Sequence, residues 1–161
     1  MTGPFVVNVA DAPAVYHERG GWSTAFEGPE RRFEQLGVNI RVLAPGQPNG
    51  LYHSETVPEA FLVLGGECLL IIDGEERALK QWDFVHCPAG TGHIFVGAGD
   101  GPCTILMAGV RGADGNGLHY PVNELAAAYG ASVAEETSEP RQAYADWGSD
   151  FRPGPLPWPP A

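Results

Sequence analysis

The sequence predicts an all-β fold, a barrel or sandwich of short strands, over residues 36–111. The first observation is a succession of short apolar segments separated by Gly, Pro and Asp-Gly turn signals, which is typical of such folds. The second is the dipeptide Asp73-Gly74 between "CLLII" and "EERAL", the strongest hairpin signal in the chain. The third is that "FLVLGG" and "CLLII" are apolar on both faces, so both faces must be covered. We expect the second face to lie against another sheet, an arm or a second subunit, and this favours a homodimer.

The predicted elements follow one another along the chain. Residues 1–35 form an N-terminal arm in which "FVVNVA" is a candidate strand. Residues 112–161 contain a short helix in "PVNELAAAYG", begun by the capping Asn123 and ended by Gly130, and then the extended proline-rich tail "RPGPLPWPPA". The barrel strands between them are expected in "GVNIRVLAP", "GLYHSE", "EAFLVLGG", "ECLLII", "EERAL", "DFVHCPAG", "HIFVGAG" and "GPCTILMAGV".

Composition limits the partners. The chain carries 20 acidic and 9 basic residues, a formal net charge of -11, which repels phosphate backbones and anionic membranes. We therefore expect no nucleic-acid partner and no membrane partner. No stretch approaches the roughly 18 apolar residues of a membrane span, and the N-terminus has no leader pattern, so a cytoplasmic location is predicted. The three cysteines are odd in number and form no CxxC pair, which argues against a disulfide framework or a four-cysteine zinc site.

Ionisable side chains gather directly before a core strand. His53, Glu55 and Glu59 precede "FLVL", and on a strand residues two apart project to the same face. Burying an unpaired carboxylate costs several kcal/mol, roughly, so a cation is the expected compensation. His93 follows the tight turn at Pro88 and Gly90 and begins another strand. Two imidazoles and two carboxylates suit Zn, Mn, Fe, Ni or Co and leave room for water or substrate.

These two segments resemble the paired motifs of the cupin superfamily, G-x5-H-x-H-x3,4-E-x6-G and G-x5-P-x-G-x2-H-x3-N. His53, Glu59 and Gly66 match the first motif, and Pro88, Gly90 and His93 match the second. The resemblance covers residues 36–110. It implies a double-stranded β-helix, or jelly-roll, barrel that binds one divalent transition metal through His53, Glu55, Glu59 and His93.

Four positions depart from the two motifs. Glu55 replaces the second His of the first motif, whose leading Gly is absent at strict spacing although Gly46 is one residue away. Trp82 replaces the leading Gly of the second motif, and Gly97 replaces its final Asn. A carboxylate in place of an imidazole adds negative charge around the metal and favours harder cations.

Several roles stay open for individual residues. His53 and His93 are either metal ligands or core histidines bonded to backbone, and Glu55 is a ligand, a general base or a rim residue. Of the neighbours His86 and Cys87, at most one faces the cavity, and packing is the favoured role for Cys87. The aromatic residues expected in the core or the pocket wall are Tyr52, Phe61, Trp82, Phe84 and Phe95.

Two functions follow, and they belong to different classes. The first is a metal-dependent enzyme for a small molecule, of the dioxygenase, isomerase, decarboxylase or epimerase type that the resemblance implies, in which Glu55 or Glu59 moves a proton. The second is a non-catalytic module that binds or senses a small ligand around a structural metal. A third reading has no metal, with Glu55 and Glu59 solvated at the barrel rim.

Overall fold

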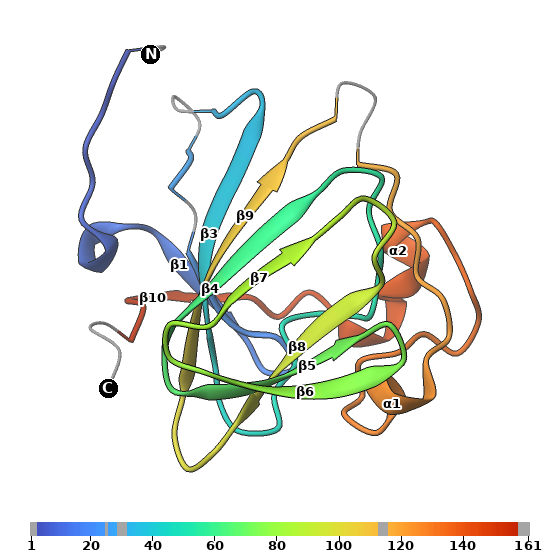
Figure 1. Cartoon of the computed structure of the whole chain (residues 1–161). Helices are drawn as coiled ribbons and strands as arrows, with labels where there is room; N and C mark the ends of the chain where they lie inside the picture. The colour runs from blue at the N-terminus through green and yellow to red at the C-terminus, as the bar shows by residue number, and fades with distance from the viewer. Residues whose placement is uncertain (1–2, 25, 29–31, 113–115, 158–161) are drawn as a thin grey trace.

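The computed structural model describes residues 3–24, 26–28, 32–112 and 116–157. These residues form ten strands arranged as a barrel, with only short helices, as Figure 1 shows. The predicted all-β class is therefore confirmed. The strands are β1 (Ala14–His17), β2 (Gly21–Thr24), β3 (Leu36–Leu43), β4 (Glu59–Gly65), β5 (Glu67–Ile72), β6 (Glu75–Lys80), β7 (Phe84–Cys87), β8 (His93–Ala98), β9 (Cys103–Val110) and β10 (Arg152–Gly154).

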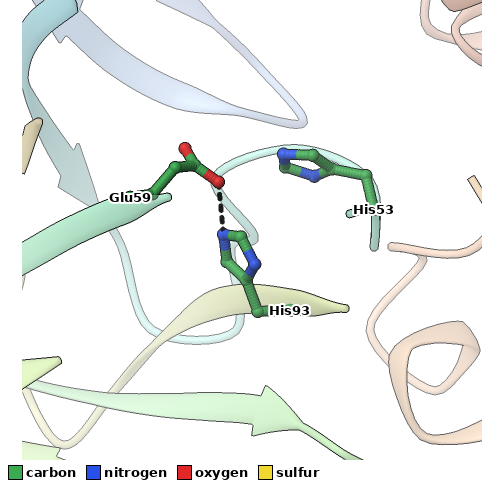
Figure 2. A group of neighbouring side chains, drawn as sticks. All are labelled: His53, Glu59 and His93. Atoms are coloured by element: carbon green, nitrogen blue, oxygen red, sulfur yellow. Dashed lines mark ion pairs between the residues drawn. The ribbon is translucent and has the colours of Figure 1, made fainter. Parts of the chain in front are cut away.

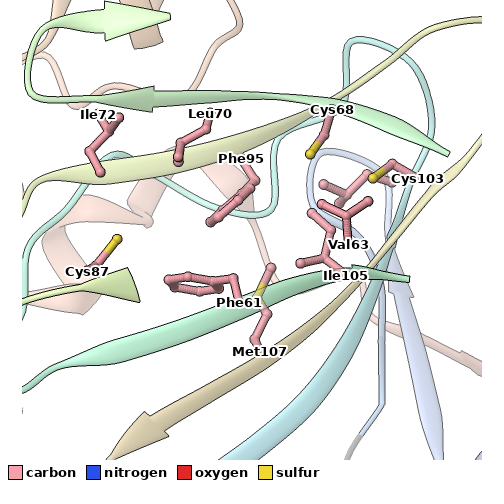
Figure 3. Packing of buried hydrophobic residues seen from close by; sticks show 11 residues of the cluster. Phe61, Val63, Cys68, Leu70, Ile72, Cys87, Phe95, Cys103, Ile105 and Met107 are labelled. Atoms are coloured by element: carbon pink, nitrogen blue, oxygen red, sulfur yellow. The ribbon is translucent and has the colours of Figure 1, made fainter. Parts of the chain in front are cut away.

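Two antiparallel sheets enclose the core. The larger sheet has the order β10-β1-β2-β3-β9-β4-β7, and the smaller has the order β6-β5-β8. Inward-facing side chains from both sheets fill the space between them (Figure 3). The core cluster consists of Leu43, Phe61, Val63, Cys68, Leu70, Ile72, Cys87, Phe95, Cys103, Ile105 and Met107. The three cysteines are free and buried in this cluster, and Cys87 thus has the packing role predicted for it.

The predicted hairpin joins β5 to β6. Asp73 and Gly74 have φ values of 50° and 77°, and Ile72 pairs with Glu75 on either side of them. Two central residues with positive φ define the tight turn whose twist matches that of the flanking strands. The Asp-Gly prediction is confirmed.

The strands that are apolar on both faces are covered by the same chain. Leu64 of β4 packs on its outer side in a cluster with Val9, Phe26 and Leu156, which come from the two ends of the chain. Ile71 of β5 packs with residues of the C-terminal segment, including Ala126 and Ala131. A second subunit is therefore not needed to cover these two faces.

The terminal segments contribute more strands than expected. "FVVNVA" is not a strand, because its end enters the short turn η1 (Val9–Asp11). The strands β1 and β2, which lie in the predicted arm, extend the larger sheet, and β10 of the tail pairs with β1. The predicted boundaries 1–35, 36–111 and 112–161 stay a prediction.

The predicted helix is confirmed as α1 (Glu124–Ala127). The Asn123 side chain accepts a hydrogen bond from Ala126 N–H, and Gly130 follows with a φ of 67°. Two further short helices are α2 (Pro140–Ala143) and η2 (Ala145–Trp147). Within the described ranges, no helix has the length and apolar character needed to cross a membrane.

Two aromatic residues predicted to lie in the core or pocket wall are on the surface instead. Trp82, in the turn before the edge strand β7, and Phe84, its first residue, are each 66% exposed. On β7 it is Val85 that packs against the core cluster and Cys87 that lies within it, so the alternation turns Phe84 and His86 outward. The expectation held for Tyr52, Phe61 and Phe95, which are buried.

Candidate metal centre

Backbone pairing brings the two histidines together. His53 N–H donates to the carbonyl oxygen of His93, and His93 N–H donates to that of His53, at 3.3 and 2.9 Å. Residues paired directly across an antiparallel bridge project to the same side, and the two imidazole centroids lie 5.1 Å apart. His53 comes from a connection that makes only isolated bridges and not from the strand predicted in "GLYHSE", whereas His93 begins β8.

Hydrogen bonds orient both rings. Nδ1 of His53 lies 2.7 Å from the Leu51 carbonyl oxygen, and Nδ1 of His93 lies 3.0 Å from that of Thr91. A carbonyl oxygen only accepts, so each Nδ1 carries the hydrogen and each neutral ring keeps a lone pair on Nε2. Burial lowers the pKa of His53, and burial together with the neighbouring His53 lowers the pKa of His93 to about 4. Both rings are therefore neutral near pH 7.

Glu59 faces His93 from the first position of β4. Its carboxylate oxygen lies 3.3 Å from His93 Nε2, as the dashed line in Figure 2 shows. Burial, and secondly the charge of Glu55, raise the pKa of Glu59 to about 7. The carboxylate thus sits where a positive charge, or a proton, is needed to offset its burial.

The donor chemistry of this group fits a metal ion. Ligand atoms of His53, Glu59 and His93 all lie within 4.8 Å of one another, and they reach one point from three separate segments (Figure 2). A lone pair on each Nε2 and a carboxylate oxygen are acceptors, so only a cation or a shared proton satisfies all three together. Fixing an imidazole through Nδ1–H to a carbonyl is also the usual support for a metal-binding histidine.

Glu55 lies beside this cluster. Its Oε1 is 3.9 Å from His53 Nε2, and its Oε2 accepts a hydrogen bond of 2.6 Å from the Asn116 side-chain amide. The Glu55 carbonyl oxygen also accepts from Gly90 N–H, so the turn of the second motif holds the backbone of the first. The carboxylate is held at the edge of the cluster, and its role as a fourth ligand stays a prediction.

The cluster opens into a cavity of about 300 Å³ at the barrel mouth. Sequence reasoning missed several polar residues in its wall. Two lie on a strand with ordinary alternation, Asn49 lies in the connection between β3 and β4, and the others lie beyond the barrel. The alternation of "VNIRVL" was the only available signal, and it does not say which face is inward. The missed residues are Asn39, Arg41, Asn49, Asn116, Tyr120 and Tyr144.

The structure explains the motif positions in backbone terms. Gly66 has a φ of 74°, and a Cβ there would lie 2.3 Å from the Pro102 carbonyl oxygen. Trp82, in place of a motif glycine, keeps a positive φ of 75°. A Cβ on Gly97 would lie 2.2 Å from the Ala44 carbonyl oxygen, so no asparagine fits this backbone.

The fold and the acceptor cluster define a β-barrel protein with a candidate mononuclear metal centre at the barrel mouth. A family model described as "Cupin domain" matches residues 39–109. Residues 39–109 are therefore similar to a cupin domain, and the fold is that of the cupin barrel, the double-stranded β-helix. A search of curated proteins gave no match.

Several solved structures resemble the chain over its barrel. A sugar phosphate isomerase from Silicibacter pomeroyi is 30% identical, with a TM-score of 0.51, over 65% of this chain and 62% of that chain. The polyketide cyclase RemF from Streptomyces resistomycificus is 16% identical, with a TM-score of 0.58, over 67% of this chain and 80% of that one. A predicted oxalate decarboxylase from Thermotoga maritima is 19% identical, with a TM-score of 0.58, over 66% and 98%. The last two likenesses show the fold alone.

Proposed function

We propose that the protein is a metal-dependent enzyme that moves a proton on a small molecule, of the isomerase or epimerase type. One divalent transition metal (Zn, Mn, Fe, Ni or Co) would be held by His53, Glu59 and His93. The observation that carries this proposal is the convergence of three acceptor atoms within 4.8 Å at the mouth of a cavity. The likeness to a sugar phosphate isomerase at 30% identity supports the same reaction type.

When bound, the metal would act as a Lewis acid that makes a proton next to a substrate carbonyl more acidic. The chain's own residues then have separate tasks. His53 and His93 present Nε2 because their Nδ1 atoms are fixed by carbonyl oxygens. Glu55 is held by Asn116 beside the cluster and is the group we assign to accept and return the proton.

The donor count favours catalysis over a structural metal. A structural site is closed by four protein ligands, whereas three ligands leave a position for substrate or water. In the described part of the chain, the grouped ligand atoms come from three residues. The alternative, a binding or sensing module with a structural metal, requires Glu55 to close the site as a fourth ligand. A dioxygenase would differ from the isomerase only in leaving the open position to oxygen.

Metal analysis of paired variants tests the centre. Protein purified without chelator should contain about one metal per chain, and His93→Gln should lose it. His86→Gln is the matched control, because His86 is an exposed imidazole on β7. Equal metal content in wild type and His93→Gln, or no uptake of any of the five metals by wild type, would remove the proposed centre.

A variant of Glu55 distinguishes the proposed enzyme from the alternative binding module. In Glu55→Gln the amide keeps an oxygen for the Asn116 hydrogen bond but is no longer a base. If Glu55 moves the proton, this variant keeps its metal and fails to exchange the hydrogen next to the carbonyl of a substrate with deuterated water, where wild type exchanges it. Loss of metal instead would make Glu55 a ligand and favour the closed site.

We also propose a homodimer through the β7 edge of the larger sheet. Phe84 begins this edge strand, Trp82 lies in the turn before it, and both are 66% exposed. Exposed aromatic side chains beside an unpaired strand edge are a ready surface for a second copy. Light scattering of wild type and Phe84→Ser tests it: a wild-type monomer would contradict the proposal. The predicted cytoplasmic location stays a prediction.

A further inference from the structure

Arg41 is a cation turned into the barrel. It lies on β3, where Asn39, Arg41 and Leu43 alternate with Ile40 and Val42. Leu43 belongs to the core cluster, whereas Ile40 and Val42 pack in the outer cluster with Ala14 and Leu156. Residues two apart on a strand share a face, so Asn39 and Arg41 point toward the interior with Leu43. Both line the cavity of the candidate metal centre.

The guanidinium has no hydrogen-bond acceptor and no ion-pair partner within the described ranges. Arg41 takes part in none of the ion pairs or side-chain hydrogen bonds there, and its buried Nε lacks an acceptor. Nearby Asn39 Oδ1 is also buried and unsatisfied. Arg111, which lines the same cavity, pairs instead with Glu27. A buried charge without a partner is costly, so such a group is retained where a ligand completes it.

The residues around Arg41 offer donors. Tyr144 oxygen accepts a hydrogen bond from Leu51 N–H at 3.0 Å, so its own hydrogen is free for another acceptor. Asn49 Oδ1 accepts from Phe95 N–H at 2.9 Å, which leaves its amide hydrogens near only the weak acceptor sulfur of Met107, at 3.8 Å. Arg41, Asn49 and Tyr144 therefore form a donor group, and all three line the cavity.

This donor group stands between two cavities. A second cavity of about 300 Å³ shares Arg41, Asn49 and Tyr144 with the first and continues to Trp147 and Phe151. The three metal-binding candidates line only the first cavity. A molecule held at Arg41 can thus reach the metal centre on one side and place an apolar group against aromatic rings on the other.

The balance of charges in the first cavity indicates which charge the ligand carries. Glu55 and Glu59 bring two negative charges to the first cavity, and a divalent metal would balance them. Arg111 is balanced by Glu27, so Arg41 leaves one positive charge. A ligand with one negative charge makes the cavity neutral, which a carboxylate does and a phosphate dianion does not.

We propose that Arg41, with Tyr144 and Asn49, is an anion subsite that binds the carboxylate of a small substrate and so presents the rest of the molecule to the metal centre. This rests on the proposed function for the metal half of the site. The guanidinium fork matches the two oxygens of a carboxylate, and its pairing there is specific for planar anions. The substrate class is thus a small hydroxy- or keto-acid.

Titration calorimetry with matched probes tests the subsite. The probes are lactate, its neutral isostere lactamide, inorganic phosphate and glycerol 3-phosphate, each added to metal-loaded and to metal-free protein. We expect lactate to bind and lactamide to bind at least about 10-fold more weakly. If only the phosphates bind, and their binding depends on Arg41, the anion subsite stands but the assignment of a carboxylate as its ligand is overturned.

Variants connect the binding to Arg41. Arg41→Met should weaken lactate binding about 10-fold to 100-fold while its melting temperature stays equal or rises, because it removes an unpaired buried charge. Arg41→Lys should recover part of the affinity. Arg77→Gln is the control, since Arg77 is an exposed guanidinium on β6 outside the cavity. Wild-type affinity for lactate in Arg41→Met would overturn the proposal.

This experiment distinguishes a failure of the proposed metal centre from a failure of the proposed anion subsite. If the protein takes up no metal but metal-free protein binds lactate through Arg41, the proposed enzyme fails and the subsite stands. If metal binds with normal stoichiometry and neither lactate nor a phosphate binds at about 10 mM, the subsite is overturned and the metal centre stands.

Discussion

The pH dependence of metal binding gives the sharpest test of the candidate centre. In the metal-free site, burial and the charge of Glu55 raise the pKa of Glu59 to about 7. A metal must displace the proton that Glu59 then holds, so the apparent association constant falls as pH drops below 7. Between pH 8 and pH 6 we expect a decrease of about tenfold, and between pH 8 and pH 5 one of about ninetyfold. A carboxyl with an unshifted pKa near about 4.5 gives less than about a twofold change over either interval.

Cobalt binding, followed by its visible absorption and by competition with a chelator of known pH dependence, measures this constant. Glu59→Gln should bind cobalt more weakly and lose the decrease between pH 8 and pH 6, because no proton competes at that position. Any remaining slope belongs to the histidines, whose pKa values are lowered by burial. His86→Gln should behave as wild type. A wild-type constant that stays within about twofold from pH 8 to pH 6 would refute the reasoning from burial to a proton-holding carboxyl.

Three further predictions concern stability. Removing the metal with EDTA should lower the melting temperature by about 5 to 10 °C relative to protein with metal at about 100 times its dissociation constant, and calorimetry that shows no shift would contradict a bound metal. In the Phe84→Ser background, where the proposed dimer is lost, Trp82→Gly should raise the free energy of unfolding by about 1 kcal/mol in urea titrations, because Trp82 has a positive φ and is 66% exposed. A decrease would mean that the ring of Trp82 is needed within the single chain. Gly66→Ala should lower it by about 2 kcal/mol or more, because a Cβ meets the Pro102 carbonyl at 2.3 Å, and unchanged urea midpoints would argue against that close approach.

The parts of the fold that could be predicted are those with a local cause. The β5–β6 hairpin follows from two residues that adopt positive φ, and α1 follows from an asparagine cap and a closing glycine. The convergence of His53 and His93 was expected from motif spacing, although the physical cause is a backbone bridge that joins two distant segments. Such a bridge leaves no mark on either segment alone.

The parts that could not be predicted depend on which face of a strand is covered. Alternation in β3 identifies two faces, and the usual expectation places Asn39 and Arg41 toward solvent. The reverse holds because the terminal segments bury Ile40 and Val42 from outside. In β7 the same ambiguity placed Phe84 inward in the prediction, whereas the structure exposes it. Only the pairing of the whole sheet decides these orientations.

The barrel and the segments beyond it supply different functional groups, and this division follows from the same geometry. The barrel and its connections supply the acceptors that suit a metal, His53, Glu59 and His93, at positions fixed by backbone pairing and by the first residue of β4. The barrel also supplies Arg41 and Asn49 of the anion subsite, whereas segments beyond it supply Asn116, which fixes Glu55, and Tyr144, which faces both cavities. Changes in these extensions can therefore alter the substrate without disturbing the metal ligands. The replacement of an imidazole by Glu55 fits this division, since the added carboxylate is held by Asn116. Together with Glu59 it would balance a divalent metal, so that Arg41 keeps one positive charge for an acidic substrate.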